Sequence, residues 1–258
     1  MKALISILFL LITNTSFAED TRYYDVEVIV FENLSENAKN AENWPLQVNL
    51  ALPEKTVQLG QPVLSEWLPE GQNIDLTSSY IELDASTFQL TRESEKLSES
   101  KSQRVILHTA WRQPGLDKNL ALPVHFKREI PVMPKTELIS EANSTSSEYE
   151  EDSAEARPSI LEGLLRVTLA RYLHLEAELT YQEKLPEVVN SNNPFSELDF
   201  ESERSKIEKQ GIIHLKQDRR RIRSNELHYL DHPVLGMLVR ITPYEKPEEV
   251  DTEKTKKP

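Results

Sequence analysis

The stretch LEGLLRVTLARYLHLEAELTY, residues 161–181, decides the fold because a helix and a strand compete for it. A helix gathers most of its leucines on one side but leaves Val167, Leu175 and Leu179 on the other. A strand places these three residues on one face, and only Arg171 is out of step with the alternation. We therefore predict one long strand over these residues.

The same alternation of apolar and polar residues recurs elsewhere in the chain. In RYYDVEVIVFE, residues 22–32, β-branched and aromatic residues alternate with acidic ones, which is typical of a strand. Pro123 and Pro131 bracket another candidate, which we expect at a sheet edge because proline donates no hydrogen bond to a neighbouring strand. The further predicted strands are 23–31, 105–111, 123–132, 213–215, 227–229 and 237–241.

The sequence contains one clear candidate for a helix. Asp84 is a suitable cap for a helix that runs to about Ser98 and turns Phe88, Thr91 and Leu97 toward the core. The proline-rich stretch 43–70 predicts irregular chain with short helical turns.

Polar stretches complete the plan of the chain. Residues 137–157 and 183–209 are rich in acidic residues and predict long polar loops, and 246–258 predicts a disordered tail. We therefore expect one domain over 19–245, of the α+β class. Its elements would be an antiparallel sheet of four to five strands, a packed helix and long polar loops.

The N-terminal stretch MKALISILFLLITNTSFA is typical of a secretory signal peptide over residues 1–18. Small residues at Ser16 and Ala18 predict cleavage after Ala18, and the apolar run is too short for a membrane span of about 20 residues. The chain has no cysteine, so it forms no disulfide and carries no lipid on an N-terminal cysteine. We expect export to a bacterial periplasm, with no stable membrane insertion after cleavage.

The net charge of the protein limits the classes of binding partner that it can have. The formal net charge of −13 disfavours nucleic acid, which requires a broad basic face. One basic patch stands against this background, in RRRIRSNELHYLDHP, residues 219–233.

Four stretches follow one another in the order RYYDVEVIVFEN, RVILHTAWRQP, RVTLARYLHLEAELTY and RRRIRSNELHYLDHPVLGMLVRITP. Taken together, they resemble the CsiV family of periplasmic peptidoglycan-binding proteins. The most specific parts are RYLHLEAEL and RSNELHYLDHP. The resemblance implies a role in cell-shape integrity, with peptidoglycan binding and association with envelope proteins that build the wall. It supplies no ligand residues, so the candidates below are chosen by their chemistry.

Catalytic motifs are incomplete in this sequence. Ser98 and Lys101 fit the S-x-x-K of penicillin-binding enzymes, but the partner motifs S-D-N and K-T-G are missing. His228 and His232 have a spacing that suits a metal on a helix, but LHYLDHP indicates a strand followed by a turn. We therefore expect no enzyme, no metal and no cofactor. A hydrolase with an unfamiliar site is the remote alternative.

The arginine-rich stretch is the stronger candidate for binding. Lys216, Arg219, Arg220, Arg221 and Arg223 accompany a single acidic residue, Asp218. Period two places Arg219, Arg221 and Arg223 on one face of an extended ribbon, where their planar guanidinium groups suit the carboxylates of peptidoglycan stem peptides. The alternative is a solvated ribbon paired across the sheet with acidic residues at 176, 178 or 183.

Aromatic side chains beside the arginines are candidate platforms for sugar rings. They are Tyr172 and His174 on the long strand, with His228 and Tyr229 in the next ribbon. Residues of this kind also pack on sheet faces without binding anything. We expect a non-enzymatic peptidoglycan-binding protein that supports wall assembly. The alternative is a periplasmic adaptor that binds an envelope protein, for instance through 137–157, without contacting the wall.

Overall fold

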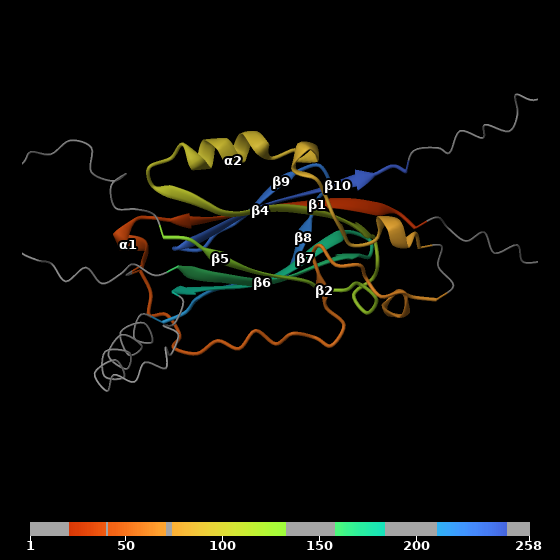
Figure 1. The fold of residues 1–258 in the computed structure, drawn as a ribbon, viewed down its shortest axis with the longest axis horizontal. Coiled ribbons are helices and arrows are strands. Elements are labelled where there is room, and N and C mark those ends of the chain that lie inside the picture. The colour runs from red at the N-terminus through yellow and green to blue at the C-terminus, as the bar shows by residue number, and fades with distance from the viewer. Residues whose placement is uncertain (1–20, 40, 71–73, 133–157, 184–210, 247–258) are drawn as a thin grey trace, which may run out of the picture.

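The computed structural model describes residues 21–39, 41–70, 74–132, 158–183 and 211–246. Within them the chain forms two sheets of five strands each (Figure 1). Sheet A contains, in spatial order, β3 (Ile81–Glu82), β4 (Gln103–Pro114), β1 (Tyr23–Asn33), β10 (Leu235–Tyr244) and β9 (Leu227–Leu230). Sheet B contains β2 (Val57–Gln58), β5 (Val124–Ile130), β6 (Ser159–Leu169), β7 (Leu173–Glu183) and β8 (Ile213–Ile222).

The two sheets enclose one hydrophobic core. Val26 and Val28 of β1, together with Trp111 of β4, belong to the same buried cluster as Leu165 of β6 and Leu175 of β7. The prediction of a single antiparallel sheet is therefore wrong: the described residues are mostly strand, in two layers, and the pairing of β2 with β5 is parallel. The apolar residues of so many strands need a second sheet as a partner surface, because one eight-residue helix covers only part of one sheet face.

The hairpin β6–β7 occupies the stretch that was predicted as one strand. Strand rather than helix is confirmed, but the chain reverses between Leu169 and Leu173, which pair across the hairpin. Arg171, the residue out of step with the alternation, lies in this turn. Gly163 of β6 leaves room for the ring of Phe126, which a Cβ at this position would contact too closely. The break in the alternation of apolar and polar residues at Arg171 thus coincides with the reversal of the chain direction.

A second turn carries the chain from sheet B to sheet A. The predicted turn at Ser224 and Asn225 joins β8 to β9, and Asn225 has a positive φ of 64°. Asparagine tolerates this left-handed conformation, and its N–H donates to the carbonyl of Ile241 at 2.8 Å. The arginine-rich segment therefore lies where the edges of the two sheets meet.

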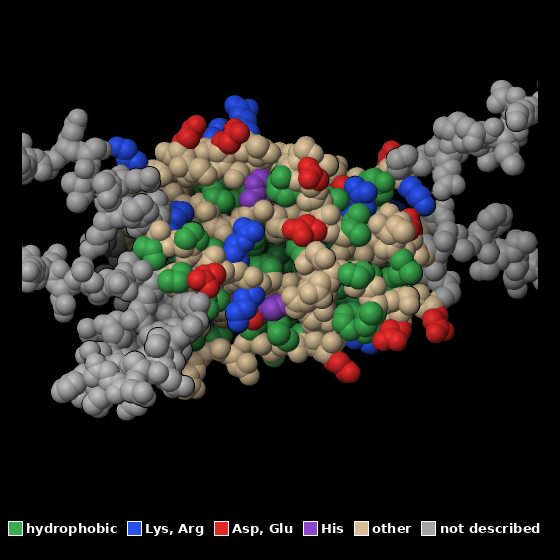
Figure 2. Space-filling model, viewed as in Figure 1, with side chains coloured by type: hydrophobic (Ala, Val, Ile, Leu, Met, Phe, Trp, Pro, Cys, Tyr) green, Lys and Arg blue, Asp and Glu red, His purple; other side chains and the backbone are tan. Residues whose placement is uncertain are grey.

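The helix is shorter than predicted. Asp84 accepts a hydrogen bond from the Ser86 N–H at 2.9 Å and caps the 3₁₀ turn η3 (Ala85–Thr87), whereas α2 spans Thr91–Ser98. Phe88 and Leu97 are partly buried, as expected, but Thr91 is exposed. The helix packs on β4, on the side of sheet A that faces away from sheet B (Figure 1). Its exposed side carries charged residues (Figure 2).

Short elements complete the described fold. They are α1 (Glu36–Lys39), η1 (Ser65–Trp67) and η2 (Leu76–Ser78). Stretch 43–70 is irregular apart from η1 and β2, as predicted. β2 pairs only with Val124 and His125 at the start of β5, so most of β5 lies at the sheet edge. The predicted signal peptide with Ala18, almost all of both acidic loops and the tail beyond Lys246 lie outside the described residues.

Candidate functional site

The outer face of sheet B is polar and faces away from the core. On β6 and β7 the leucines that point inward are fully buried, whereas the residues between them are only partly buried. Arg166 on β6 lies opposite Glu176 on β7, and Glu178 lies between Leu164 on β6 and Lys216 on β8. Because side chains alternate along a strand, these charged residues share one face of the sheet.

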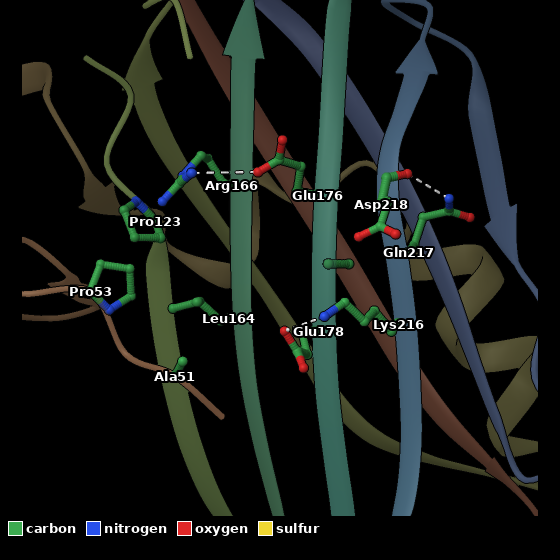
Figure 3. Close-up of a pocket in the computed structure, with 11 residues that line it drawn as sticks. Ala51, Pro53, Pro123, Leu164, Arg166, Glu176, Glu178, Lys216, Gln217 and Asp218 are labelled. Carbon is green, nitrogen blue, oxygen red and sulfur yellow. Dashed lines mark hydrogen bonds and ion pairs between the residues drawn. The ribbon is translucent and has the colours of Figure 1, made fainter. Parts of the chain in front are cut away.

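A groove of about 230 Å³ lies on this face (Figure 3). Strands β6, β7 and β8 form its floor. Part of its wall comes from Ala51 and Pro53, which belong to the irregular chain that precedes β2. The lining residues are Ala51, Pro53, Pro123, Leu164, Arg166, Glu176, Ala177, Glu178, Lys216, Gln217 and Asp218.

Charges of both signs meet in this groove. Glu176 lies 3.5 Å from Arg166 Nη1 and 3.1 Å from the ammonium of Lys118. Glu178 lies 2.9 Å from Nε2 of His214 and 3.6 Å from the ammonium of Lys216.

Two groups of the groove remain incompletely paired. The Nε atom of Arg166 is buried and has no hydrogen-bond partner. The carboxylate of Asp218 is exposed and makes no ion pair or hydrogen bond with the described part of the chain. The groove therefore contains an incompletely paired guanidinium on β6 and, within the described chain, an unpaired carboxylate on β8.

Three of the predicted site residues meet beside the groove. The guanidinium carbon of Arg221 lies 3.4 Å from the centroid of the Tyr172 ring, and Arg221 pairs across the sheet with His174. This distance is well within the range of a cation–π contact. Tyr172 is 38% exposed at the β6–β7 turn, so its ring presents both an apolar surface and a fixed cation.

The arginines follow β8 away from the groove. The register of β8 shifts so that Asp218 and Arg219 both lie opposite Glu176, which is a β-bulge. Arg219, Arg221 and Arg223 are all exposed, and Arg223 lies just beyond the last residue of β8. In the described part of the chain neither Arg219 nor Arg221 pairs with a carboxylate. Glu176 and Glu178 pair with other cations instead.

The remaining predicted residues lie at the junction and on the other sheet. The backbone N–H of Arg223 donates to Nε2 of His228 at 3.1 Å. Tyr229 faces outward from sheet A, where its ring stacks on Phe31 at 6.2 Å. Burial, a hydrogen bond to Asp231 and the charge of that carboxylate raise the pKa of Tyr229 to about 12. The structure thus separates Tyr229 from the surface around Tyr172.

The predicted strand followed by a turn at His228 and His232 is confirmed. His232 Nδ1 accepts from the N–H groups of Val234 and Leu235, both at 3.3 Å, and its ring packs against Trp44. Burial lowers the pKa of His232. The described residues contain no group of three or more His, Cys, Asp or Glu side chains arranged to hold a metal ion.

Arg166 and the wall at Ala51 and Pro53 were missed by the sequence reasoning. Arg166 and Glu176 each point outward between two buried apolar residues, so placing the reversal near Arg171 would have revealed that they face each other. The wall had no such signal, because it comes from irregular chain more than 100 residues away from β6.

The fold and this surface define a two-layer β protein with an open, mixed-charge face suited to binding a charged ligand. A sequence model of the family described as "Peptidoglycan-binding protein, CsiV" matches residues 2–244, and the chain belongs to this family. No curated protein and no solved structure matches the chain. None of the described helices combines the length and apolarity that crossing a membrane requires.

Proposed function

We propose that this chain is a non-enzymatic, periplasmic peptidoglycan-binding protein that supports cell-wall assembly and cell shape. The family description supports binding to peptidoglycan. The single observation that carries the location of the site is the exposed cation–π pair of Arg221 and Tyr172 on the outer face of sheet B. It lies beside Arg219, another exposed arginine without a carboxylate partner in the described chain.

This surface suits both components of peptidoglycan. Stem peptides carry carboxylates, which arginine holds with two parallel hydrogen bonds. Glycan sugars pack their flat apolar faces on aromatic rings, and Tyr172 offers them the part of its ring that the Arg221 guanidinium leaves exposed. Because the chain carries a formal net charge of −13, an exposed arginine cluster is also a place where an anionic polymer meets attraction instead of repulsion.

The second candidate function is that of an adaptor for an envelope protein. It is favoured by the edge strand β9 of sheet A, where Leu227 and Tyr229 are 47% and 44% exposed. Exposed apolar side chains beside an unpaired strand edge are suited to a protein partner. The acidic segment 137–157, the other predicted adaptor surface, lies outside the described residues.

The test changes Arg219, Arg221 and Arg223 to Gln together and measures co-sedimentation with purified sacculi over a salt series. We expect the parent to bind at low salt, and the triple variant to lose most of this binding while keeping its circular dichroism spectrum. Salt should weaken the parent because exposed charges are screened over about 10 Å at 0.1 M.

A matched control removes three exposed cations from the opposite side of the molecule. Arg92→Gln, Lys96→Gln and Lys101→Gln change the net charge equally, on and just after α2. This control should bind as the parent does. Equal binding by both triple variants would show that Arg219, Arg221 and Arg223 are not the binding surface, and the adaptor function would then be favoured.

A further inference from the structure

The groove on the outer face of sheet B is small for a sugar chain. Its volume is about 230 Å³. Pockets that hold drug-sized ligands begin at about 300 Å³. A ligand segment of one or two amino-acid residues therefore fills the groove, and a longer ligand extends beyond it.

The incompletely paired groups of the groove suit a ligand that carries both a negative and a positive charge. In the described chain Arg166 makes a single ion pair, through Nη1 at 3.5 Å, and its side chain is 24% exposed, so the outer N–H groups of its guanidinium are available for a carboxylate. Asp218 has no cation partner in the described chain and is available for an ammonium group. Glu176 and Glu178 are each already paired with two basic groups.

The strands that carry Arg166 and Asp218 indicate how far apart the two charges of a ligand should be. Arg166 lies on β6 and Asp218 on β8, with Glu176 on β7 between them (Figure 3). Neighbouring strands are about 4.8 Å apart, so the backbones that carry the two free groups are roughly 10 Å apart. A ligand that contacts both positions suits a carboxylate and an ammonium on different residues better than the two groups on one carbon atom. A short peptide that carries a carboxylate at one end and an amine on a side chain spans such a distance.

We propose that this groove binds the peptide part of peptidoglycan, with a stem-peptide carboxylate at Arg166 and a side-chain ammonium of the same peptide at Asp218. This inference rests on the proposed function and deepens it, because it assigns the stem peptide and not the glycan to the groove. The bulge at Asp218 and Arg219 joins the groove to the arginines on β8. A neighbouring stem or sugar ring then meets Arg221 and Tyr172.

The experiment titrates the full chain with free stem tetrapeptide released from sacculi, and with the same peptide acetylated on its side-chain amine, using calorimetry or NMR. We expect acetylation to weaken binding to the parent about tenfold, because it removes the charge that Asp218 contacts. In Asp218→Asn the same acetylation should have almost no effect. Glu95→Gln on α2 removes one negative charge from an exposed position elsewhere and should retain the tenfold effect.

A second pair of variants tests the carboxylate. Amidating the peptide's C-terminal carboxylate should weaken binding to the parent about tenfold and should have little effect on Arg166→Gln. Lys118 still pairs with Glu176 in that variant, so the fold should survive, which circular dichroism checks. Arg92→Gln is the control of equal charge and should respond as the parent does.

Two failures are distinguishable. If the parent does not bind sacculi, the proposed function fails. If the parent binds sacculi but not the tetrapeptide, or if Asp218→Asn remains as sensitive to acetylation as the parent, the assignment of the groove is overturned while wall binding stands. The assignment would also be overturned if the disaccharide without a peptide bound as tightly as the same disaccharide linked to the tetrapeptide.

Discussion

Glutamate–histidine pairs occur on the outer faces of both sheets, but in opposite surroundings. On sheet A, Glu27 lies 2.8 Å from Nε2 of His108, and its side chain is only 7% exposed. On sheet B, Glu162 lies 2.9 Å from Nε2 of His125, and its side chain is 24% exposed. The two pairs have nearly the same geometry, so the covering chain makes the difference between them.

On sheet A, the segment that leads into α2 covers the carboxylate of Glu27 and is held in place by it. We call Glu27 the anchor of this segment. Glu27 accepts hydrogen bonds from the N–H groups of Gln89 at 2.7 Å and Leu90 at 2.9 Å, just before α2 begins. A carboxylate at the start of a helix satisfies N–H groups that have no partner within the helix. Ile29 and Leu90 are fully buried on this face. On sheet B, the groove and the exposed arginines remain accessible. The covered face therefore contributes stability, whereas the described chain leaves the outer face of sheet B more exposed.

The largest expected effect is on the covered face. Leu90→Ala removes a fully buried side chain, and we expect it to lower the free energy of unfolding by about 3 kcal/mol. Leu164→Ala, on the partly buried groove floor, is the control and should cost less than about 1 kcal/mol. Urea denaturation measures both. Equal losses would mean that the two outer faces do not differ in their contribution to stability.

A smaller effect is expected from the anchor itself. Glu27→Gln replaces one acceptor oxygen with a donor that faces backbone N–H groups, and should lower the free energy of unfolding by about 2 kcal/mol. Limited proteolysis should then cut near Gln89 and Leu90 sooner than in the parent. Glu178→Gln on sheet B is the control, with a side chain 24% exposed, and should change stability by under about 1 kcal/mol. A control loss as large as that of Glu27→Gln would contradict the comparison.

The smallest effect is a pH dependence on the open face. Burial acts to raise the pKa of Glu162, but hydrogen bonds from His125 and Lys127 outweigh it, so the pKa lies below its ordinary value of 4.5. A lowered carboxylate pKa adds stability above pH 4.5, and this contribution is lost as pH falls through the folded-state pKa.

The stability difference between the parent and Glu162→Gln should therefore shrink on going from pH 6 to pH 3. It should stay under about 1 kcal/mol throughout, because the pair is solvated. Urea midpoints at several pH values measure it. A difference that stays constant with pH would show that the charge of Glu162 contributes nothing.

Most strands were predictable from local pattern, whereas their assembly into two sheets was not. The alternation along 23–31 and 105–111 correctly identified β1 and β4. Alternation shows which face of a strand is buried, but it does not show which other element covers that face. The predicted helix began too early, because Asp84 suits a 3₁₀ turn as well as an α-helix. For the candidate site, the exposure of the three arginines followed from their charge. The contact of Arg221 with Tyr172 depended on the unpredicted reversal at Arg171.

The sequence by itself determined what depends on neighbouring residues: the strands of 161–181 and the turn at Ser224 and Asn225. Period two and the tolerance of asparagine for positive φ act within a few residues. Only the tertiary structure decided that Glu27 is an anchor and that Arg166 and Asp218 share a groove. Glu27 meets Leu90 from 63 positions away, and the groove needs strands from both sides of residues 184–210. Burial and free hydrogen-bonding capacity depend on which distant segments pack together, and no local pattern specifies that.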